Sequence, residues 1–236
     1  MTDGGMKAGS HAAVSPVRIE GRLDEPLSRW LWLVKWLLAV PHLIVLVFLW
    51  IAFAVLTIVA GLSVVFTGTY PIGIFDFNVG VLRWTWRVTY YATSAMGTDR
   101  YPPFSLDRVD DYPATLDIDY PQHLSRGLVL VKWWLLAIPH YVIVAIFTAG
   151  WSIGGPRVDN NTAHRSWSFG FAGGLIGVCS IIACVVLLVR SSYPRGLHDF
   201  IMGMNRWVYR VIVYAALMTD VYPPFRFDGG ATEVAG

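Results

Sequence analysis

A long repeat constrains this chain more than any other feature. Residues 27–42 read LSRWLWLVKWLLAVPH, and residues 124–140 read LSRGLVLVKWWLLAIPH. The lysines of the two copies are 97 residues apart, whereas the histidines are 98 residues apart. Self-similarity of this kind indicates two structural units of the same type in tandem.

Two further motifs follow each copy. YPIGIFDFNVGVLRWTWRV at 70–88 returns as YPRGLHDFIMGMNRWVYRV at 193–211, and TDRYPPF at 98–104 returns as TDVYPPF at 219–225. The offset grows from 98 at the histidines to 123 at the YP pairs, so the second copy carries an insertion of 25 residues. The predicted organisation is a disordered tail (1–16), a first membrane repeat (17–110), a second membrane repeat (111–228) with an extracytoplasmic insertion at about 150–174, and a C-terminal tail (229–236).

The composition is that of a membrane protein. Hydrophobic residues make up 55% of the chain and charged residues 14%, and the mean hydropathy is +0.52. A soluble fold of this size would lack polar surface. The formal net charge of +2 is too small to argue for nucleic acid as a partner. Cys179 and Cys184 are five residues apart in one apolar run, which favours packing over a disulfide.

The first apolar run is too long for one straight crossing. It extends from Leu31 to Phe66, about 54 Å as a helix against a hydrocarbon core of about 30 Å. The insertion in the second copy marks where such a run turns, because a segment rich in Gly, Asn and Pro cannot sit in lipid. We therefore expect a transmembrane hairpin in each repeat, formed in the first copy by Leu31–Leu49 and Ile51–Thr67. A single bent helix is the alternative.

The segment after each hairpin is amphipathic. At 100° per residue its charged side chains fall on one face. They are Asp76, Arg83 and Arg87 in the first copy and Asp199, Arg206 and Arg210 in the second. This pattern predicts a helix in the headgroup region, which its arginines orient. Binding of anionic lipid phosphates or a partner protein by the arginines is the alternative for these residues, and a third crossing is the alternative for the helix.

Short strands are expected before each repeat. Val17–Leu23 and Thr115–Tyr120 alternate between apolar and polar residues. Ser28 and Ser125 are then predicted to cap the following helices. The predicted fold is an all-α integral membrane protein of two tandem repeats, each a two-helix transmembrane hairpin plus an amphipathic interfacial helix, with short β segments before each repeat.

The three motifs in this order, LSR-LVKW-IPH, YP-G-DF-G-RW-R and TD-YPPF, resemble an actinobacterial membrane family known as domain of unknown function 4389. The resemblance covers roughly Val17 to Asp228. It implies a protein of the actinobacterial plasma membrane and supplies no activity. The chain departs from its own pattern at Leu23–Pro26, which reads LDEP where the second copy has DYPQ at Asp119–Gln122.

The distribution of basic residues predicts the orientation. Of the 18 Lys and Arg residues, only Arg157 and Arg165 would lie outside the cell in the hairpin topology. An excess of basic residues marks the cytoplasmic side. We therefore expect a multi-pass protein of the cell membrane with both termini in the cytoplasm.

Four polar residues lie inside the apolar runs. Lys35 and Lys132 are expected to snorkel to the headgroups, with a polar pathway between the repeats as the alternative. His42 and His140 each follow a proline and are expected to satisfy the backbone there, with proton relay as the alternative. No His, Cys or carboxylate cluster has metal-ligand spacing, so neither a metal nor another cofactor is predicted.

These observations favour a non-catalytic scaffold or accessory subunit. Its expected partners are membrane lipids, anionic headgroups among them, and a protein partner or a second copy of the chain. A small-solute or lipid transporter, or a lipid-binding membrane protein, is the alternative. An enzyme is least favoured, because the sequence has no Gly-rich phosphate loop, nucleophile elbow or zinc signature.

Overall fold

Each repeat begins with a short strand and continues into helices. The structure, a computed structural model of the whole chain, describes residues 15–149, 151–154, 168–171, 174–225 and 227. The first repeat contains β1 (Val17–Gly21), α1 (Trp32–Leu38), α2 (Val40–Thr67) and α3 (Ile72–Ala92). The second repeat contains β2 (Ala114–Ile118), α4 (Arg126–Val131), the π-helical turn η1 (Lys132–Leu136), α5 (Ile138–Thr148), β3 (Trp151–Gly154), β4 (Ser168–Phe171), α6 (Gly174–Arg190) and α7 (Arg195–Ala215).

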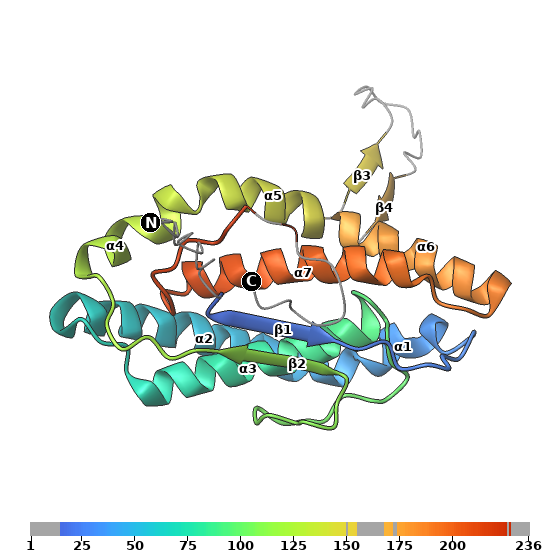
Figure 1. Cartoon of the computed structure of the whole chain (residues 1–236), viewed down its shortest axis with the longest axis horizontal. Helices are drawn as coiled ribbons and strands as arrows, with labels where there is room; N and C mark the ends of the chain where they lie inside the picture. Colours follow the sequence, from blue (N-terminus) through green and yellow to red (C-terminus); the bar gives the residue numbers. More distant parts are fainter. Residues whose placement is uncertain (1–14, 150, 155–167, 172–173, 226, 228–236) are drawn as a thin grey trace, which may run out of the picture.

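The predicted tails and insertion are described only in part. Of the tails at 1–16 and 229–236, only Ser15 and Pro16 are among the described residues. Within the insertion, β3 and β4 pair antiparallel and project from the junction of α5 and α6 (Figure 1). The two arginines expected outside the cell, Arg157 and Arg165, lie outside the described residues.

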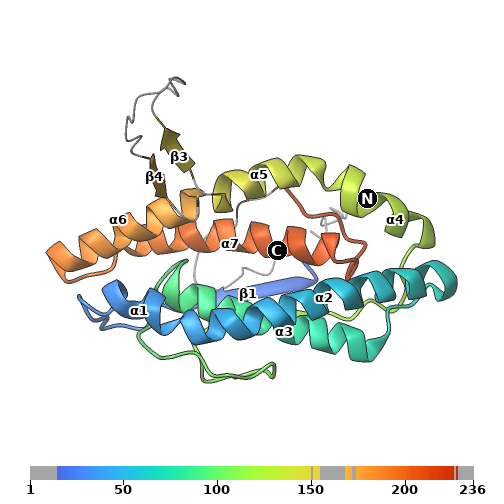
Figure 2. The same cartoon turned by 180° about the vertical axis from the view of Figure 1, so that it is seen from behind.

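The elements form three layers (Figures 1 and 2). The two-stranded sheet of β1 and β2 lies on one side, α3 and α7 lie behind it, and α1, α2, α4, α5 and α6 lie on the far side. The strands pair antiparallel, with Val17 opposite Ile118 and Gly21 opposite Ala114. Alternate strand residues, among them Ile19 and Leu116, are buried against the helices, which is the period-two pattern that the sequence showed.

The two repeats exchange their strands. β1 packs on α7 and β2 packs on α3, so each strand lies on the amphipathic helix of the other repeat. Two arginines make this contact in equivalent ways. Arg83 Nε donates to the Leu116 carbonyl at 2.9 Å, and Arg206 Nε donates to the Ile19 carbonyl at 3.1 Å. The strands therefore join the repeats into one unit.

The predicted transmembrane hairpins are wrong. α2 runs for 28 residues through the expected turn at Trp50, because that point has no Gly or Pro to break it. Only in the second copy does the insertion divide the equivalent helix, into α5 and α6. Among the described residues, α2 alone is long and apolar enough to cross a membrane, and the bent unit of α4, η1 and α5 passes only if it is counted as one span. The all-α multi-span fold is therefore corrected to three layers that include a sheet.

The amphipathic helices are not at the periphery either. They are α3 and α7, and they form the central layer between the sheet and the outer helices (Figures 1 and 2). Their polar faces turn to the strands, which supply backbone carbonyls to the arginines and to Trp86, whose Nε1 donates to the Glu20 carbonyl at 3.0 Å. A polar stripe satisfied by a strand looks the same in sequence as one that faces headgroups.

The one-residue difference between the repeats has a structural explanation. The first copy has eight residues from lysine to histidine and the second has nine. The extra residue is absorbed in η1, where the Ala137 amide donates to the Lys132 carbonyl five residues earlier, at 3.0 Å. A π-helical turn accommodates one more residue than an α-helical turn. Lys132 and His140 therefore keep the positions of Lys35 and His42.

Candidate functional site

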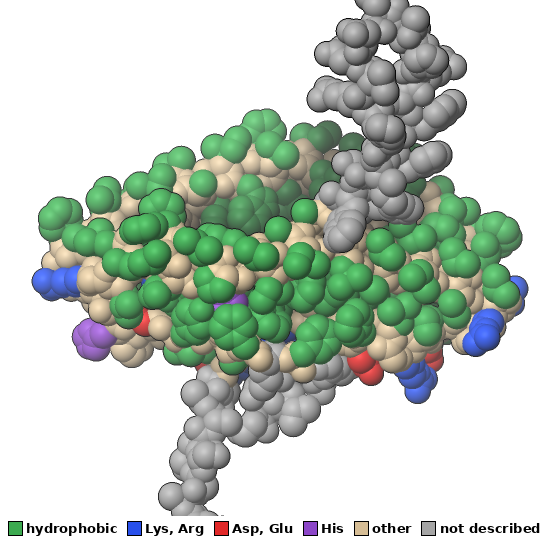
Figure 3. Space-filling model, turned by 90° about the horizontal axis from the view of Figure 1, so that it is seen from above, with side chains coloured by type: hydrophobic (Ala, Val, Ile, Leu, Met, Phe, Trp, Pro, Cys, Tyr) green, Lys and Arg blue, Asp and Glu red, His purple; other side chains and the backbone are tan. Residues whose placement is uncertain are grey.

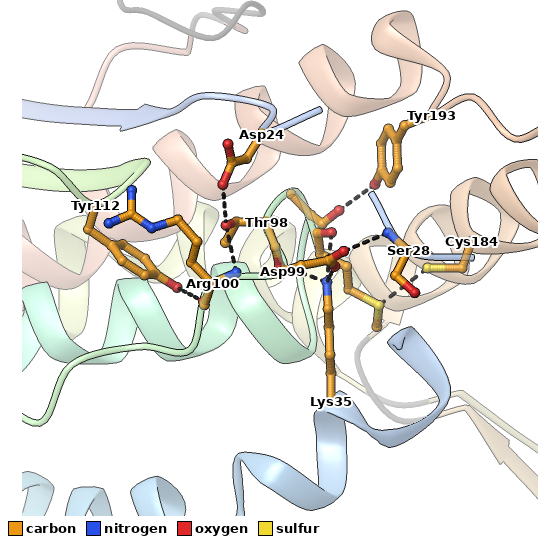
Figure 4. Close-up of polar contacts among 11 residues, drawn as sticks. Asp24, Ser28, Lys35, Thr98, Asp99, Arg100, Tyr112, Cys184 and Tyr193 are labelled. Carbon is orange, nitrogen blue, oxygen red and sulfur yellow. Dashed lines mark hydrogen bonds and ion pairs between the residues drawn. The ribbon is translucent and has the colours of Figure 1, made fainter. Parts of the chain in front are cut away.

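The buried lysine of the first repeat is held by the TD-YPPF motif. Lys35 in α1 is 2% exposed, and its Nζ lies 2.8 Å from the Asp99 carboxylate and 2.7 Å from the Thr98 carbonyl. The other Asp99 oxygen accepts a hydrogen bond from the Ser28 amide. Figure 4 shows Lys35 reaching from its helix to Asp99, which lies between the lysine and Ser28. We call Ser28, Lys35, Thr98 and Asp99 the first clamp.

The second repeat contains the same arrangement. Lys132 is fully buried, and its Nζ lies 2.8 Å from Asp220 and 2.9 Å from the Thr219 carbonyl. Asp220 also accepts from the Ser125 amide at 2.6 Å. We call Ser125, Lys132, Thr219 and Asp220 the second clamp. The predicted serine caps are therefore corrected, because Ser28 and Ser125 are held by their backbone amides rather than capping with their hydroxyls.

Further polar contacts surround the first clamp (Figure 4). The Thr98 hydroxyl donates to Asp24 at 3.0 Å, and the Tyr112 hydroxyl donates to the Arg100 carbonyl at 3.1 Å. On the other side, burial raises the pKa of the Cys184 thiol to about 11. Burial also lowers the pKa of Lys35, while its hydrogen bond to Asp99 and the charge of that carboxylate oppose the shift.

The histidines are enclosed by aromatic side chains. His42 Nδ1 accepts from Trp84 Nε1 at 3.0 Å, and its ring stacks on Phe104 with 3.8 Å between centroids. His140 is held in the same way by Trp207 at 3.2 Å and by Phe225 at 4.5 Å. Because Nδ1 accepts a hydrogen bond in both rings, the neutral histidine carries its proton on Nε2.

The tyrosine of each YPPF segment satisfies the backbone where the helices break. The Tyr101 hydroxyl donates to the Leu38 carbonyl at 3.1 Å, and the Tyr222 hydroxyl donates to the Leu136 carbonyl at 3.4 Å. Both carbonyls lie where the chain changes direction just before the proline. The tyrosine and phenylalanine of each motif thus lie against the proline–histidine break.

The predicted arginine site is distributed among several internal contacts. Arg83 pairs with Asp117 at 2.9 Å, and Arg87 donates to the Ser105 carbonyl. Arg206 and Arg210 are buried in α7. Asp76 is exposed, and Asp199 lies 3.5 Å from His198. The structure therefore does not bring either aspartate to the arginines of its own helix.

The space beside the first pair of arginines is small. Arg83 and Arg87 line a cavity of about 10 Å³ together with Asp107 and Arg108. A cavity of that volume holds one water molecule, and a phosphate group is larger. The cavity also lies against β2, on the opposite side of α3 from the outer helices.

The four buried polar residues do not meet. Lys35 and His42 belong to α1 and α2, whereas Lys132 and His140 belong to η1 and α5. Figure 1 places α1 and α4 at opposite ends of the molecule. Among the described residues, no group of three or more His, Cys, Asp or Glu side chains is arranged to hold a metal ion.

The partners of the buried lysines and histidines were not predicted from the sequence. No role was predicted for Asp99 and Asp220 or for Trp84 and Trp207. The signal was the joint repetition of three motifs, since segments repeated together at matching spacings contact one another in both units. The residues so paired are Lys35–Asp99, Lys132–Asp220, His42–Trp84–Phe104 and His140–Trp207–Phe225.

Comparison with known proteins identifies one family. Its model is described as Domain of unknown function (DUF4389) and matches residues 29–105 and 168–226, which together make up more than half of the chain. The matched regions contain the lysine and histidine of the first repeat and the TD-YPPF motifs of both. No curated protein and no solved structure matches the chain.

Proposed function

Since the chain belongs to the DUF4389 family, whose description names no activity, we propose its function from its two contrasting faces. The protein is a non-catalytic scaffold that lies in one leaflet of a membrane. Its outer helices are immersed in lipid, and its sheet faces the water and is free to contact a protein partner.

The exposed apolar face carries this proposal. α2 has no charged residue. In its most apolar stretch of 18 residues, only 17% is buried inside the protein. Large apolar side chains are also exposed along α1, α4, η1, α5 and α6. Figure 3, seen from the α5 and α6 side, shows hydrophobic side chains over the helices of that side, with charges at the lower edge and the two ends. An apolar surface of this extent marks a membrane or protein interface.

Tryptophans favour lipid as the occupant of this face. Four of them are half to two-thirds exposed near the ends of the outer layer, namely Trp30, Trp36, Trp133 and Trp134. Tryptophan is enriched where a membrane meets water, because its ring is apolar and its N–H is polar. At a protein interface, tryptophans instead cluster near the centre of the contact.

The opposite face is charged. Arg18 pairs with Asp119 at 2.6 Å, and Arg108 pairs with Asp117 at 2.6 Å on the outer side of the sheet. Exposed pairs of this kind contribute little to stability. They keep this face hydrated, and they leave it suited to a charged protein partner.

The arrangement of the layers favours insertion parallel to the membrane. α2 is about 42 Å long, and it packs along α3, whose other side carries β2. If α2 crossed the bilayer, α3 and the charged sheet that runs alongside it would have to enter the hydrocarbon (Figure 1). Lying flat, the outer helices bury their apolar side in the upper acyl region while the sheet remains in water.

The internal contacts of the motif residues agree with a scaffold. The clamp lysines and the two histidines are all engaged with partners in the same chain. They hold the outer helices at a defined angle to the central layer. Their repetition therefore shapes the apolar face.

Flotation with vesicles tests this function. The protein, removed from detergent in the presence of phosphatidylcholine vesicles, is expected to float with them, and Ile51→Asp together with Ile58→Asp is expected to weaken flotation at least tenfold, since each places a charge on the lipid side. The matched control is Glu20→Ala with Asp110→Ala on the opposite face, which should float normally. A detergent-free protein that stays monodisperse in buffer and does not bind vesicles would overturn the proposal.

A further inference from the structure

The outer layer is divided above α3 and α7 by a cleft. Its volume is about 330 Å³. One wall carries Thr85, Thr89 and Thr93, which follow one side of α3 to its C-cap at intervals of four residues. The other carries Asn205 and Tyr209 of α7. Figure 2 shows α7 running between α2 on one side and α5 and α6 on the other.

The lining of the cleft is mostly apolar and carries no charged side chain, and its polar groups are hydroxyls and one amide. Besides these residues the cleft is lined by Ser94, Thr148, Ile176, Val208 and Ile212. It opens between helices that otherwise present apolar side chains. A row of hydroxyl groups inside a lipid-facing surface has no role in holding that surface in lipid.

The hydroxyl groups are oriented as hydrogen-bond acceptors. Thr89 Oγ donates to the Thr85 carbonyl at 2.9 Å, Thr85 Oγ to the Val81 carbonyl at 2.7 Å, and Thr148 Oγ to the Val144 carbonyl at 2.8 Å. A threonine hydroxyl has one proton and two lone pairs. With the proton used on their own helix, these groups have lone pairs left for a ligand, although Thr85 Oγ already accepts from Trp50 Nε1 at 3.2 Å and Thr89 Oγ lies 3.5 Å from the Tyr209 hydroxyl.

Asn205 also offers a hydrogen-bond acceptor to the cleft. Its amide nitrogen donates to Ser94 Oγ at 2.6 Å and to the Ile201 carbonyl at 2.8 Å. Both donors are therefore used, and the amide oxygen is the group with capacity left. The cleft therefore suits a ligand that donates hydrogen bonds, and a ligand with a negative charge meets no cationic side chain in its lining.

A second, also mostly apolar cleft follows further along α7. Ile212 lines the first cleft and Ala215 lines the second, three residues further on the same helix. The second cleft has a volume of about 450 Å³ and is lined by residues that include Ile58, Leu62 and Leu130. A cleft with a row of hydroxyl groups, followed along the same helix by a second apolar cleft, matches the hydroxyl-bearing headgroup and the chain of one amphiphile.

From this geometry we propose that the cleft binds a neutral lipid with free hydroxyl groups. The hydroxyls donate to Thr89, Thr148 and Asn205, and an acyl chain lies in the second cleft. This assignment rests on the proposed membrane location and goes beyond it, because it gives the two repeats a shared ligand where they meet. A diacylglycerol and a glycosyl diacylglycerol have this chemistry.

Photolabelling tests the proposal. The probe is a diacylglycerol with a diazirine in its acyl chain, presented in phosphatidylcholine vesicles and, in parallel, in detergent micelles. Labelled peptides are expected to come from α7 and from α2 between Thr57 and Val65. Unlabelled diacylglycerol should compete and phosphatidic acid should not, while competition by a glycosyl diacylglycerol would show that a sugar headgroup also fits.

Two variants locate the site. Thr89→Val removes the acceptor at nearly constant volume and is expected to reduce labelling about fivefold, the effect of one hydrogen bond, and Ile212→Trp should abolish it by filling the cleft. The matched control is Thr67→Val, since Thr67 makes the same contact to its own helix at 2.8 Å outside the cleft. Equal labelling of all variants, or competition by phosphatidic acid, overturns the proposal. Loss of flotation with normal labelling in micelles would contradict the membrane location alone.

Discussion

Lys132 Nζ lies 2.8 Å from the Asp220 carboxylate, although the lysine side chain is fully buried and a quarter of the aspartate side chain is exposed. Lys35 and Asp99 repeat the same distance with nearly the same burial. Each pair joins the first helix of a repeat to the segment that follows its last helix. The clamps therefore close each repeat into a ring of contacts.

Removing the aspartate of a clamp should lower the unfolding free energy more than removing the lysine. Asp220→Ala leaves a buried ammonium with only the Thr219 carbonyl, and a loss of about 2–3 kcal/mol in unfolding free energy is expected, at the low end for buried pairs because Asp220 is partly exposed. Lys132→Met leaves an aspartate that still contacts water and the Ser125 amide, so the loss should be about 1 kcal/mol. Denaturant unfolding in micelles measures the stability loss of each variant. Equal losses would contradict the conclusion that the aspartate pairs a buried lysine.

The motif glycines should differ in their tolerance of alanine. A Cβ at Gly80 would lie 2.8 Å from Leu106 Cβ and 3.0 Å from the Leu106 carbonyl oxygen, whereas a Cβ at Gly203 would meet only the ring of Phe227. The backbone of Leu106 cannot move aside as the ring of Phe227 can. Gly80→Ala should therefore lower the unfolding free energy by about 1–3 kcal/mol. Gly203→Ala should change stability by less than about 1 kcal/mol, because its helix also gains propensity. Thermal unfolding of the two variants under one condition makes the comparison.

Deleting one of the two tryptophans at 133 and 134 should be tolerated. The shortened segment has the length of the first copy, which positions its lysine and histidine without a π-helical turn. A loss of about 1 kcal/mol or less is expected. As a control, deletion of Leu130 rotates Lys132 by about 100° away from Asp220 and should prevent normal folding. If both deletions are equally harmful, the extra residue has a role beyond its length.

His198 should make stability depend on pH. Its Nε2 lies 3.1 Å from the Tyr90 hydroxyl, and burial lowers its pKa below the ordinary value of 6.5, with Asp199 opposing the shift. Because the folded state binds this proton less readily than the unfolded state, the contribution of the neutral ring is complete above pH 6.5 and is lost as the pH falls below it. Melting temperatures at pH 7.5 and 5.5 should differ more for the native protein than for His198→Gln. A larger difference in the variant would contradict this sign.

The strands and the insertion could be read from the sequence because they depend on local signals. Alternation at residues 17–23 and 115–120 marks the positions of β1 and β2, and the change in offset marks the segment between α5 and α6. The partners of the strands could not be read in this way. Each strand lies on the helix of the other repeat, so its contacts join residues far apart in the sequence. The sequence of one repeat contains no signal for these contacts.

The hairpin prediction failed because one assumption was carried from the second copy to the first. The insertion separates α5, which ends at Thr148, from α6, which begins at Gly174, and the same break was expected at Trp50, where α2 stays helical. The arginine stripe was misread for a related reason. Carbonyls of β1 and β2 satisfy Arg83 and Arg206, and a strand that arrives from the other repeat is invisible in a helical periodicity.

The depth of α2 in the bilayer tests the membrane orientation most directly. Ile44, Ile51 and Ile58 are all more than half exposed and, at a spacing of seven, lie on one side of the helix. Nitroxide labels at Ile44→Cys, Ile51→Cys and Ile58→Cys, in phosphatidylcholine vesicles, report depth through their accessibility to oxygen and to a water-soluble relaxant. Insertion parallel to the membrane predicts three depths within about 5 Å of one another. A change of about 10 Å from each label to the next, the rise of seven helical residues, would show that α2 crosses the bilayer and would contradict the account.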